Sequence, residues 1–252
     1  MSLIPHGAIE SAKRHARLEF PKESCGVVVD DRYIPCTNVA ADPLTEFRIA
    51  PDELGRAVAD GKLVAVIHSH PGGPVFPSEA DMRSQMSGDV PWGIIPLDED
   101  RTGELVLWGD TLPIPDIVGR EFLHGVRDCY NLIRDCFRLG RDRLAEQGVE
   151  GWPYDPIELE EIPRDDGWWD RGRDLYRTNF ERVGFHPVPL NEARAGDVFL
   201  LAIRSSQLNH GGVILSNNLI LHHLPARLSR REPAGLWARR ADLILRWSGA
   251  DA

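Results

Sequence analysis

The sequence predicts an α+β protein of two domains. Three observations favour this class: apolar strand-like runs alternate with helical stretches in the first half, a proline-containing stretch interrupts the chain near residue 112, and the second half shows a helix followed by several strands. The chain of 252 residues is long enough for two ordinary domains. We expect a first domain over residues 1–112, a linker over 113–119 and a second domain over 120–252.

The first half should contain three helices and four strands. The run LVAVI is continuous, apolar and largely β-branched, which is typical of a strand buried on both faces, and it leads directly into His68. Pro51 suits the first turn of a helix. We expect helices over residues 5–19, 51–60 and 78–88, and strands over 25–29, 63–67, 92–97 and 104–109.

The second half begins after the segment TLPIPDIVG, 111–119, whose two prolines and weak periodicity indicate a linker. One long helix and four strands should form the body of this domain. We expect a helix over 128–147, an irregular acidic stretch over 151–190 with a short helix near 170–183, and strands in GDVFLLAI, HGGVILS, NLILHHL and ADLILRW.

Composition excludes several classes of protein. A net charge of −10 argues against nucleic acid as a principal ligand, because binding phosphates needs a basic surface. No apolar run reaches the length of a signal peptide or a membrane span, so we expect synthesis in the cytoplasm and no membrane insertion. Four cysteines without a C-x-x-C pair indicate neither a disulfide framework nor a cysteine zinc knuckle.

The stretch HSHPGGPVFPSEAD, 68–81, is the first candidate site. Alternate side chains of an extended chain share a face, so His68 and His70 can point at one ion. Ser78 and Asp81 lie three apart at a helix start. Two imidazoles and a carboxylate leave a fourth zinc position for water, as catalysis requires. Alternatively, Ser78 is an N-cap and the histidines are ordinary residues at a strand end.

The full pattern H-S-H-P-x(6)-S-x-x-D resembles the signature of the JAMM metallopeptidases. This resemblance extends over most of the first domain and implies an α/β/α fold with one zinc ion per chain. It implies that His68, His70 and Asp81 bind the zinc, that Glu23 in PKESCGVVV is the general base, and that the Ser78 hydroxyl steadies the oxyanion.

The segment RDCYNLIRDCFRL is the second candidate site. It places Cys129 in the first turn of a helix, where the backbone amides favour a thiolate. A cysteine nucleophile needs an imidazole, and His210 and His222 lie on consecutive strands that a hairpin would bring side by side. Alternatively, Cys129 is core filler, as we expect for Cys136, Cys25 and Cys36.

The D-C motif, the segment A-R-A-G-D-V at 193–198 and the run H-G-G-V-I-L resemble the NlpC-type peptidases, which are papain-like cysteine peptidases that cleave stem peptides of bacterial cell wall. The resemblance implies that Cys129 is the nucleophile, His210 the base and His222 the orienting residue, in preference to His223. Members commonly carry an oxyanion tyrosine about a dozen residues before the cysteine. Here position 117 is Ile, so only the Cys129 amide is assigned to the oxyanion.

The two motifs in one chain, with Asp166-Gly167-Trp168-Trp169 between them, resemble the tail-tip assembly peptidases of long-tailed bacteriophages. This resemblance implies other tail-tip proteins as partners and host peptidoglycan as substrate. It also implies a protein made in the host cytoplasm, carried at the phage tail tip and delivered to the cell envelope on infection. The alternative is an assembly or structural module of the tail tip whose peptidase folds serve binding.

Overall fold

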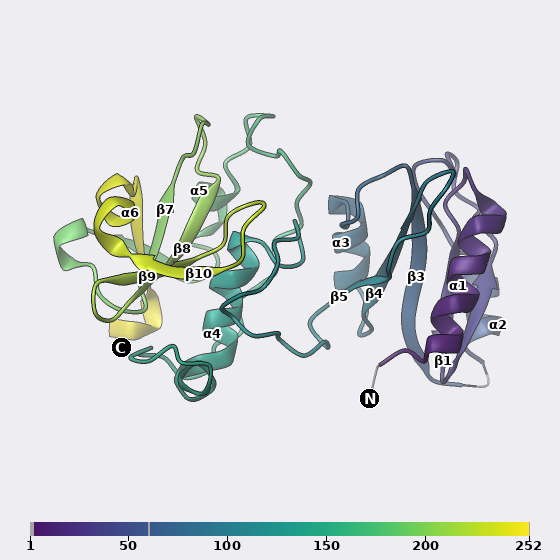
Figure 1. Ribbon diagram of the computed structural model, residues 1–252, viewed down its shortest axis with the longest axis horizontal. Coiled ribbons are helices and arrows are strands. Elements are labelled where there is room, and N and C mark those ends of the chain that lie inside the picture. Colours follow the sequence, from purple (N-terminus) through teal and green to yellow (C-terminus); the bar gives the residue numbers. More distant parts are fainter. Residues whose placement is uncertain (1–2, 60, 252) are drawn as a thin grey trace. The chain divides into compact units, whose positions relative to one another are not determined.

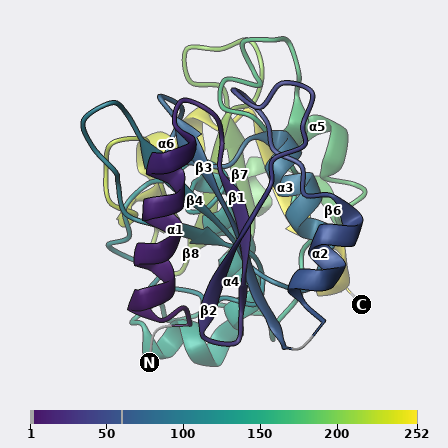
Figure 2. The same cartoon turned by 90° about the vertical axis from the view of Figure 1, so that its right-hand side faces the viewer.

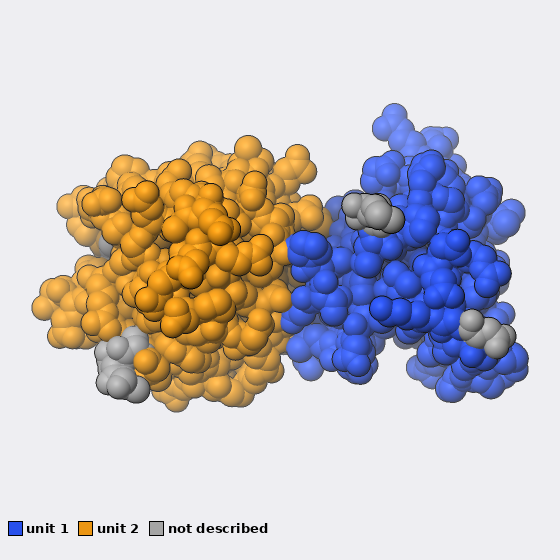
Figure 3. Space-filling model, turned by 90° about the horizontal axis from the view of Figure 1, so that it is seen from below, with its two compact units in different colours: residues 1–113 blue, residues 114–252 orange. Residues whose placement is uncertain are grey.

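The computed structural model describes residues 3–59 and 61–251. The chain separates into two compact units, unit 1 up to Pro113 and unit 2 from Ile114 onward (Figure 3). Each unit has its own β-sheet and its own helices (Figure 1). The predicted mixed α+β class with two sheets is therefore confirmed.

Unit 1 is built on a five-stranded sheet with the strand order β2-β1-β3-β4-β5. Only the β3–β4 pair is parallel, and the other neighbours are antiparallel. Its elements are α1 (His6–Glu19), β1 (Cys25–Val29), β2 (Arg32–Cys36), α2 (Pro51–Ala57), β3 (Leu63–Pro71), α3 (Glu79–Met86), β4 (Trp92–Leu97) and β5 (Val106–Trp108).

Helices cover both faces of this sheet, which gives unit 1 three layers. Helix α1 presents Ala8, Ala12 and Ala16 to one face, and such small side chains allow close approach to the strands. Helix α2 packs on the opposite face, where the buried residues of β1 form a second apolar cluster. Figure 2 shows α1 on one side of the strands and α2 and α3 on the other.

Unit 2 is built on a six-stranded antiparallel sheet with the order β10-β9-β8-β7-β11-β6. The long helix α4 packs on one face, mainly against β8, and α6 lies on the other. Its elements are α4 (Cys129–Glu146), α5 (Leu175–Asn179), β6 (Phe185–Val188), a 3-10 turn (Leu190–Glu192), β7 (Val198–Leu201), β8 (His210–Leu215), β9 (Leu219–His222), β10 (Arg230–Pro233), α6 (Ala234–Arg240), β11 (Leu243–Trp247) and a second 3-10 turn (Ser248–Asp251).

Three strands are present that the sequence did not predict, and all of them lie at a sheet edge. They are β2, β6 and β10, and each contains a proline, at Pro35, Pro187 and Pro233 respectively. Proline cannot donate to a β-ladder, and charged or proline-containing strands are tolerated at edges. The same features hide such strands from a search for buried, alternating runs.

Two predicted helices differ from those observed. The helix expected near 170–183 is only the five-residue α5, preceded by turns. The helix expected over 128–147 is present, but it is interrupted at Gly140, whose φ is 68°. A Cβ at this position would lie 2.6 Å from the ring of Pro156, so the break lets the following loop pack closely.

The segment expected to be a linker contributes to the core of unit 2. Ile117 is fully buried there, and Ile114 and Val118 pack against the same cluster. Near the end of the chain, Arg246 is buried and forms an ion pair with the buried Asp197. Among the described residues, no helix combines the length and apolar character that crossing a bilayer demands.

Candidate functional site

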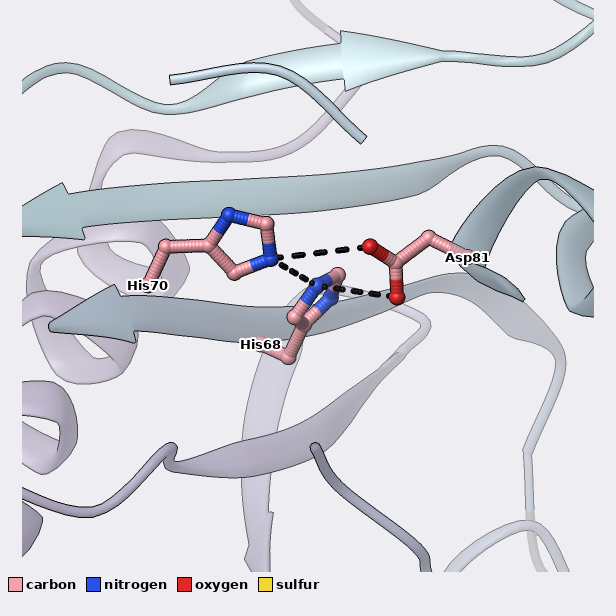
Figure 4. A group of neighbouring side chains, drawn as sticks. All are labelled: His68, His70 and Asp81. Carbon is pink, nitrogen blue, oxygen red and sulfur yellow. Dashed lines mark hydrogen bonds and ion pairs between the residues drawn. The ribbon is translucent and has the colours of Figure 1, made fainter. Parts of the chain in front are cut away.

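The first candidate site lies where β3 ends and α3 begins. His68 and His70 extend from β3 toward Asp81 in the first turn of α3 (Figure 4). The two Nε2 atoms are 3.0 Å apart, His68 Nε2 is 3.4 Å from Asp81 Oδ1, and His70 Nε2 is 3.6 Å from Asp81 Oδ2. The structure therefore brings together all three residues that the resemblance assigned to zinc.

Neighbouring groups fix the orientation of each of these side chains. His70 Nδ1 hydrogen-bonds the Pro74 carbonyl at 2.8 Å, which leaves Nε2 to face Asp81. His68 stacks on Phe47 with ring centroids 4.4 Å apart. The side chain between them, Ser69, points the other way and bonds Ser24. A hydrogen bond to the second ring nitrogen, as His70 has, is typical of metal-binding histidines.

The donor set fits a zinc ion. Tetrahedral zinc with bonds of about 2.0–2.1 Å separates its ligand atoms by about 3.3 Å, close to the three spacings seen here. Although burial opposes ionisation, hydrogen bonds with His68 and His70 hold the pKa of Asp81 below its usual range. Burial lowers the pKa of His68 and so favours the neutral ring that a metal requires. His68 Nδ1 is buried without a hydrogen-bond partner.

Glu23 lies on the same face as the two histidines. Strand β1 pairs with β3 in antiparallel register, with Cys25 opposite His68, so the register continued by two residues places Glu23 opposite His70. Glu23 is 6% exposed, and burial raises its pKa to about 7. It lines a polar cavity of about 380 Å³ that also contains Asn38. A carboxyl group with this pKa can exchange protons near neutral pH.

Ser78 forms hydrogen bonds that hold Asp81 in place. Its hydroxyl donates to Asp81 Oδ2 at 2.7 Å and accepts the Asp81 amide at 3.1 Å, while the Ser78 amide donates to Asp81 Oδ2 at 2.9 Å. This reciprocal capping box fixes the start of α3 and the carboxylate with it. The N-cap interpretation of Ser78 is thus present in the structure, and its oxyanion role stays a prediction.

The second candidate site lies at the start of α4. Asp128 caps the helix by accepting the amides of Tyr130 and Asn131, and the Cys129 thiol follows directly. Helix α4 lies close to β8 because that strand has glycine at 211, where a Cβ would be 3.1 Å from Ile133. This close approach places Cys129 and His210 on the wall of one cavity.

His210 is hydrogen-bonded to His222, and a carboxylate lies farther along the same line. His210 Nε2 lies 3.1 Å from His222 Nδ1, and His222 Nε2 lies 3.7 Å from Glu232 Oε2. The ring of the adjacent His223 instead contacts Phe122, with centroids 5.2 Å apart. The structure therefore pairs His210 through Nε2 with His222 and not with His223.

The thiol is not activated at rest as the helix position suggested. Desolvation raises the pKa of Cys129 to about 11, with a further increase from Asp128. Desolvation also lowers the pKa of His210 to about 3. The expectation of a resting thiolate is thus corrected: the capping carboxylate of Asp128 and the apolar surroundings outweigh the helix-start amides. Neutral thiol and neutral imidazole are the resting forms.

The cavity beside Cys129 has a volume of about 460 Å³ and mainly apolar walls. Trp168 and Trp169 of the D-G-W-W segment line it. His124 also lines it and is 6% exposed, with Nδ1 3.9 Å from Asp128. The loop before α4 folds inward and buries His124.

Sequence reasoning missed two residues of this site. The hydroxyl of Tyr176 lies 3.3 Å from Cys129 Sγ, although the two residues are 47 positions apart. Glu232 reaches His222 from the edge strand β10. Neither carries a local motif, since Tyr176 is in the short helix α5 between turns and Glu232 is in a strand that was not predicted.

Comparisons with known proteins define the class of unit 1. A family model described as prokaryotic homologs of the JAB domain matches residues 5–108. A probable TtuB-protein conjugate cleaving protease of Thermus thermophilus is 36% identical over 32% of this chain and 60% of its own length. Unit 1 is therefore a JAB-like domain of the peptidase-like type.

Two relatives extend the likeness to nearly the whole chain. Tail tip assembly protein K of Escherichia phage lambda is 36% identical over 79% of this chain and 88% of its own length. Tail tip assembly protein K of Escherichia phage N15 is 31% identical over 95% of this chain and 93% of its own length. The chain belongs to the family of phage tail tip assembly protein K.

Proposed function

We propose that this protein is a tail-tip hydrolase with two reaction centres. The centre in unit 2 cleaves peptide bonds in the stem peptides of host peptidoglycan. The zinc centre in unit 1 processes a tail protein or cuts an amide crosslink. The observation that carries the proposal is that Cys129 and His210 line one apolar cavity, with His222 hydrogen-bonded to His210 behind it, in a chain that also holds a His-His-Asp cluster.

The cysteine centre acts as a papain-like, NlpC-type site in this proposal. His210 Nδ1 takes the proton of the Cys129 thiol as the sulfur attacks the peptide carbonyl, and the ring later gives that proton to the leaving amine. His222 holds the ring through Nε2 at 3.1 Å. Because both resting groups are neutral, the proton moves only when substrate is in place.

In this proposal the residues of unit 1 have separate roles in a metallopeptidase reaction. His68, His70 and Asp81 hold the ion, which when bound supplies a Lewis acid for polarising an amide carbonyl. Glu23, with a pKa of about 7, takes a proton from the attacking water at its carboxylate and returns it to the leaving nitrogen. Ser78 positions Asp81 through the capping box.

One observation favours the alternative that the peptidase folds serve binding in tail assembly. A thiol with a pKa of about 11 is a weak nucleophile until a substrate or partner changes its surroundings. A binding module would keep the cavity and would not need the thiol. The two functions therefore differ in what loss of Cys129 does.

Digestion of isolated peptidoglycan tests the proposal. Parent protein, Cys129→Ala and Asp81→Ala are each incubated with wall, and the products are identified by mass while bound metal is quantified. We expect Cys129→Ala to lose digestion and keep its metal, and Asp81→Ala to lose metal and keep digestion. Equal digestion by the parent and Cys129→Ala would contradict the cysteine centre and favour the binding module.

A further inference from the structure

Tyr176 has no role in the function proposed so far, yet its hydroxyl is in contact with the thiol. Its oxygen lies 3.3 Å from Cys129 Sγ. The ring is held by aromatic neighbours, Trp168 at 6.1 Å and Tyr130 at 6.3 Å between centroids, both edge to face. Side chains held this way stay in one place, which suits a fixed hydrogen-bond donor.

The position of this hydroxyl matches where negative charge would develop. When sulfur attacks a carbonyl carbon, the S–C bond forms and the C=O π pair moves to oxygen. That oxygen is two bonds from sulfur. A donor already within 3.3 Å of Sγ is thus in reach of it, at the distance of about 2.7–3.1 Å that oxyanion donors adopt.

Few other hydrogen-bond donors near Sγ are available to the oxyanion. Asp128 accepts the amides of Tyr130 and Asn131, so of these first-turn amides of α4 only that of Cys129 is left without this carboxylate as its acceptor. One backbone donor alone leaves the oxyanion undersatisfied, and a second donor within reach is the Tyr176 hydroxyl.

We propose that Tyr176 is a catalytic residue of unit 2 that donates its phenolic hydrogen bond to the oxyanion formed on attack by Cys129, together with the Cys129 amide. The proposal rests on the proposed peptidase function of the cysteine centre. The thiol proton goes to His210 Nδ1, and the oxyanion then re-forms C=O as the C–N bond breaks and the amine leaves with that proton. The phenol keeps its proton throughout.

The protonation state of Tyr176 agrees with this role. Desolvation raises the pKa of the phenol well above its ordinary value, so the hydroxyl remains a donor at any pH at which the enzyme is assayed. A donor that cannot ionise stabilises charge without competing for the proton that His210 must carry.

Tyr176→Phe tests the proposal, because it removes only the hydroxyl. The control is Tyr33→Phe in unit 1, whose hydroxyl bonds His15 and not the thiol. Hydrolysis of soluble stem peptides and alkylation of Cys129 by iodoacetamide are measured for each protein. Alkylation needs the thiol but forms no oxyanion.

We expect Tyr176→Phe to lower kcat about 10²- to 10³-fold with little change in KM, and to alkylate within about threefold of the parent. Tyr33→Phe should stay near the parent in both assays. Unchanged hydrolysis by Tyr176→Phe overturns the proposal, and so does an equal loss of alkylation, which would mean that the hydroxyl acts on the thiol. If the parent itself cleaves no stem peptide, the proposed function fails, and this inference falls with it.

Discussion

Unit 1 and unit 2 each bury a pair of histidines, but the two pairs face different third groups. In unit 1, Asp81 lies 3.4–3.6 Å from both rings and is held ionised, so the cluster carries negative charge that a cation would neutralise. In unit 2, His210 contacts a second neutral ring, that of His222, and lines the same cavity as the neutral thiol of Cys129. The spacing of the histidines does not decide between metal binding and proton transfer, whereas the third group does.

Loss of the Asp81 carboxylate, the third group of unit 1, should have the largest effect on this difference between the units. Asp81→Asn keeps the shape but removes the charge, and we expect zinc to bind about 10²- to 10³-fold more weakly, which is about one ligand's share of a structural zinc site. Competition with a chromogenic chelator measures the affinity. Asp52→Asn, at an exposed pair with Arg56, is the matched control and should bind as the parent does.

The result that would contradict this account is equal zinc affinity in Asp81→Asn and the parent. The cluster would then be a hydrogen-bonded group of polar residues rather than a metal centre. Alkylation of Cys129 in the same variant reports on unit 2. Its rate should be unchanged, because the two centres are expected to be independent.

The neutral state of the unit 2 pair predicts an unusual pH profile. Because the pKa of Cys129 is about 11, the thiolate fraction should rise about tenfold per pH unit well below that value. Iodoacetamide alkylation should therefore be about 100-fold faster at pH 9 than at pH 7. Cys129→Ala corrects for the three buried thiols, Cys25, Cys36 and Cys136.

A resting thiolate–imidazolium pair would give a different curve. Its alkylation rate would be flat between pH 7 and 9, because the thiol would already be ionised below this range. A flat profile would restore the expectation drawn from the helix start and would remove the electrostatic contrast between the two units.

Glu232 offers a smaller perturbation of the same pair. Its carboxylate lies 3.7 Å from His222 Nε2 and also accepts the Trp237 indole N–H. Glu232→Gln should weaken the orientation of His222, and through it His210, and lower kcat for stem peptides about tenfold, less than loss of a carboxylate that contacts the base directly. Glu150→Gln, at an exposed position, is the control.

A higher KM without a change in kcat would show that Glu232 acts on substrate binding in the cavity and not on the orientation of the two imidazoles. Rescue of kcat by Glu232→Asp would support the orienting role, because the carboxylate is retained at a slightly greater distance. The two readouts separate positioning from packing.

The sequence predicted the parts of this molecule that depend on local pattern. The run LVAVI is the buried strand β3, and the H-x-H spacing along it brings His68 and His70 to one face, as strand geometry requires. The parallel partner β4 and the JAB-like class of unit 1 agree with that expectation. The strand is encoded by a run of five residues, and the His-His-Asp cluster by the single segment 68–81.

What the sequence did not predict depends on contacts between distant segments. The thiol of Cys129 was expected to be ionised because its own helix favours that state, but burial against β8 reverses the preference. Tyr176 comes from the five-residue helix α5, and Glu232 comes from a charged edge strand. Desolvation and contacts between distant segments of the chain leave no local sequence pattern. Such residues can therefore be identified only from the folded structure.

Ser78 gives the smallest predicted effect and separates support from chemistry in unit 1. Ser78→Ala removes the hydroxyl that caps α3 and bonds Asp81, so α3 should lose about 1 kcal/mol of local stability. Amide hydrogen exchange of residues 79–86, followed by mass spectrometry, should become about fivefold faster. Ser78→Thr retains a capping oxygen and should exchange nearly as the parent does. If Ser78→Ala exchanges at the parent rate but loses peptidase activity, the hydroxyl acts on the substrate oxyanion, as the JAMM resemblance implied, and not chiefly on the helix that presents Asp81.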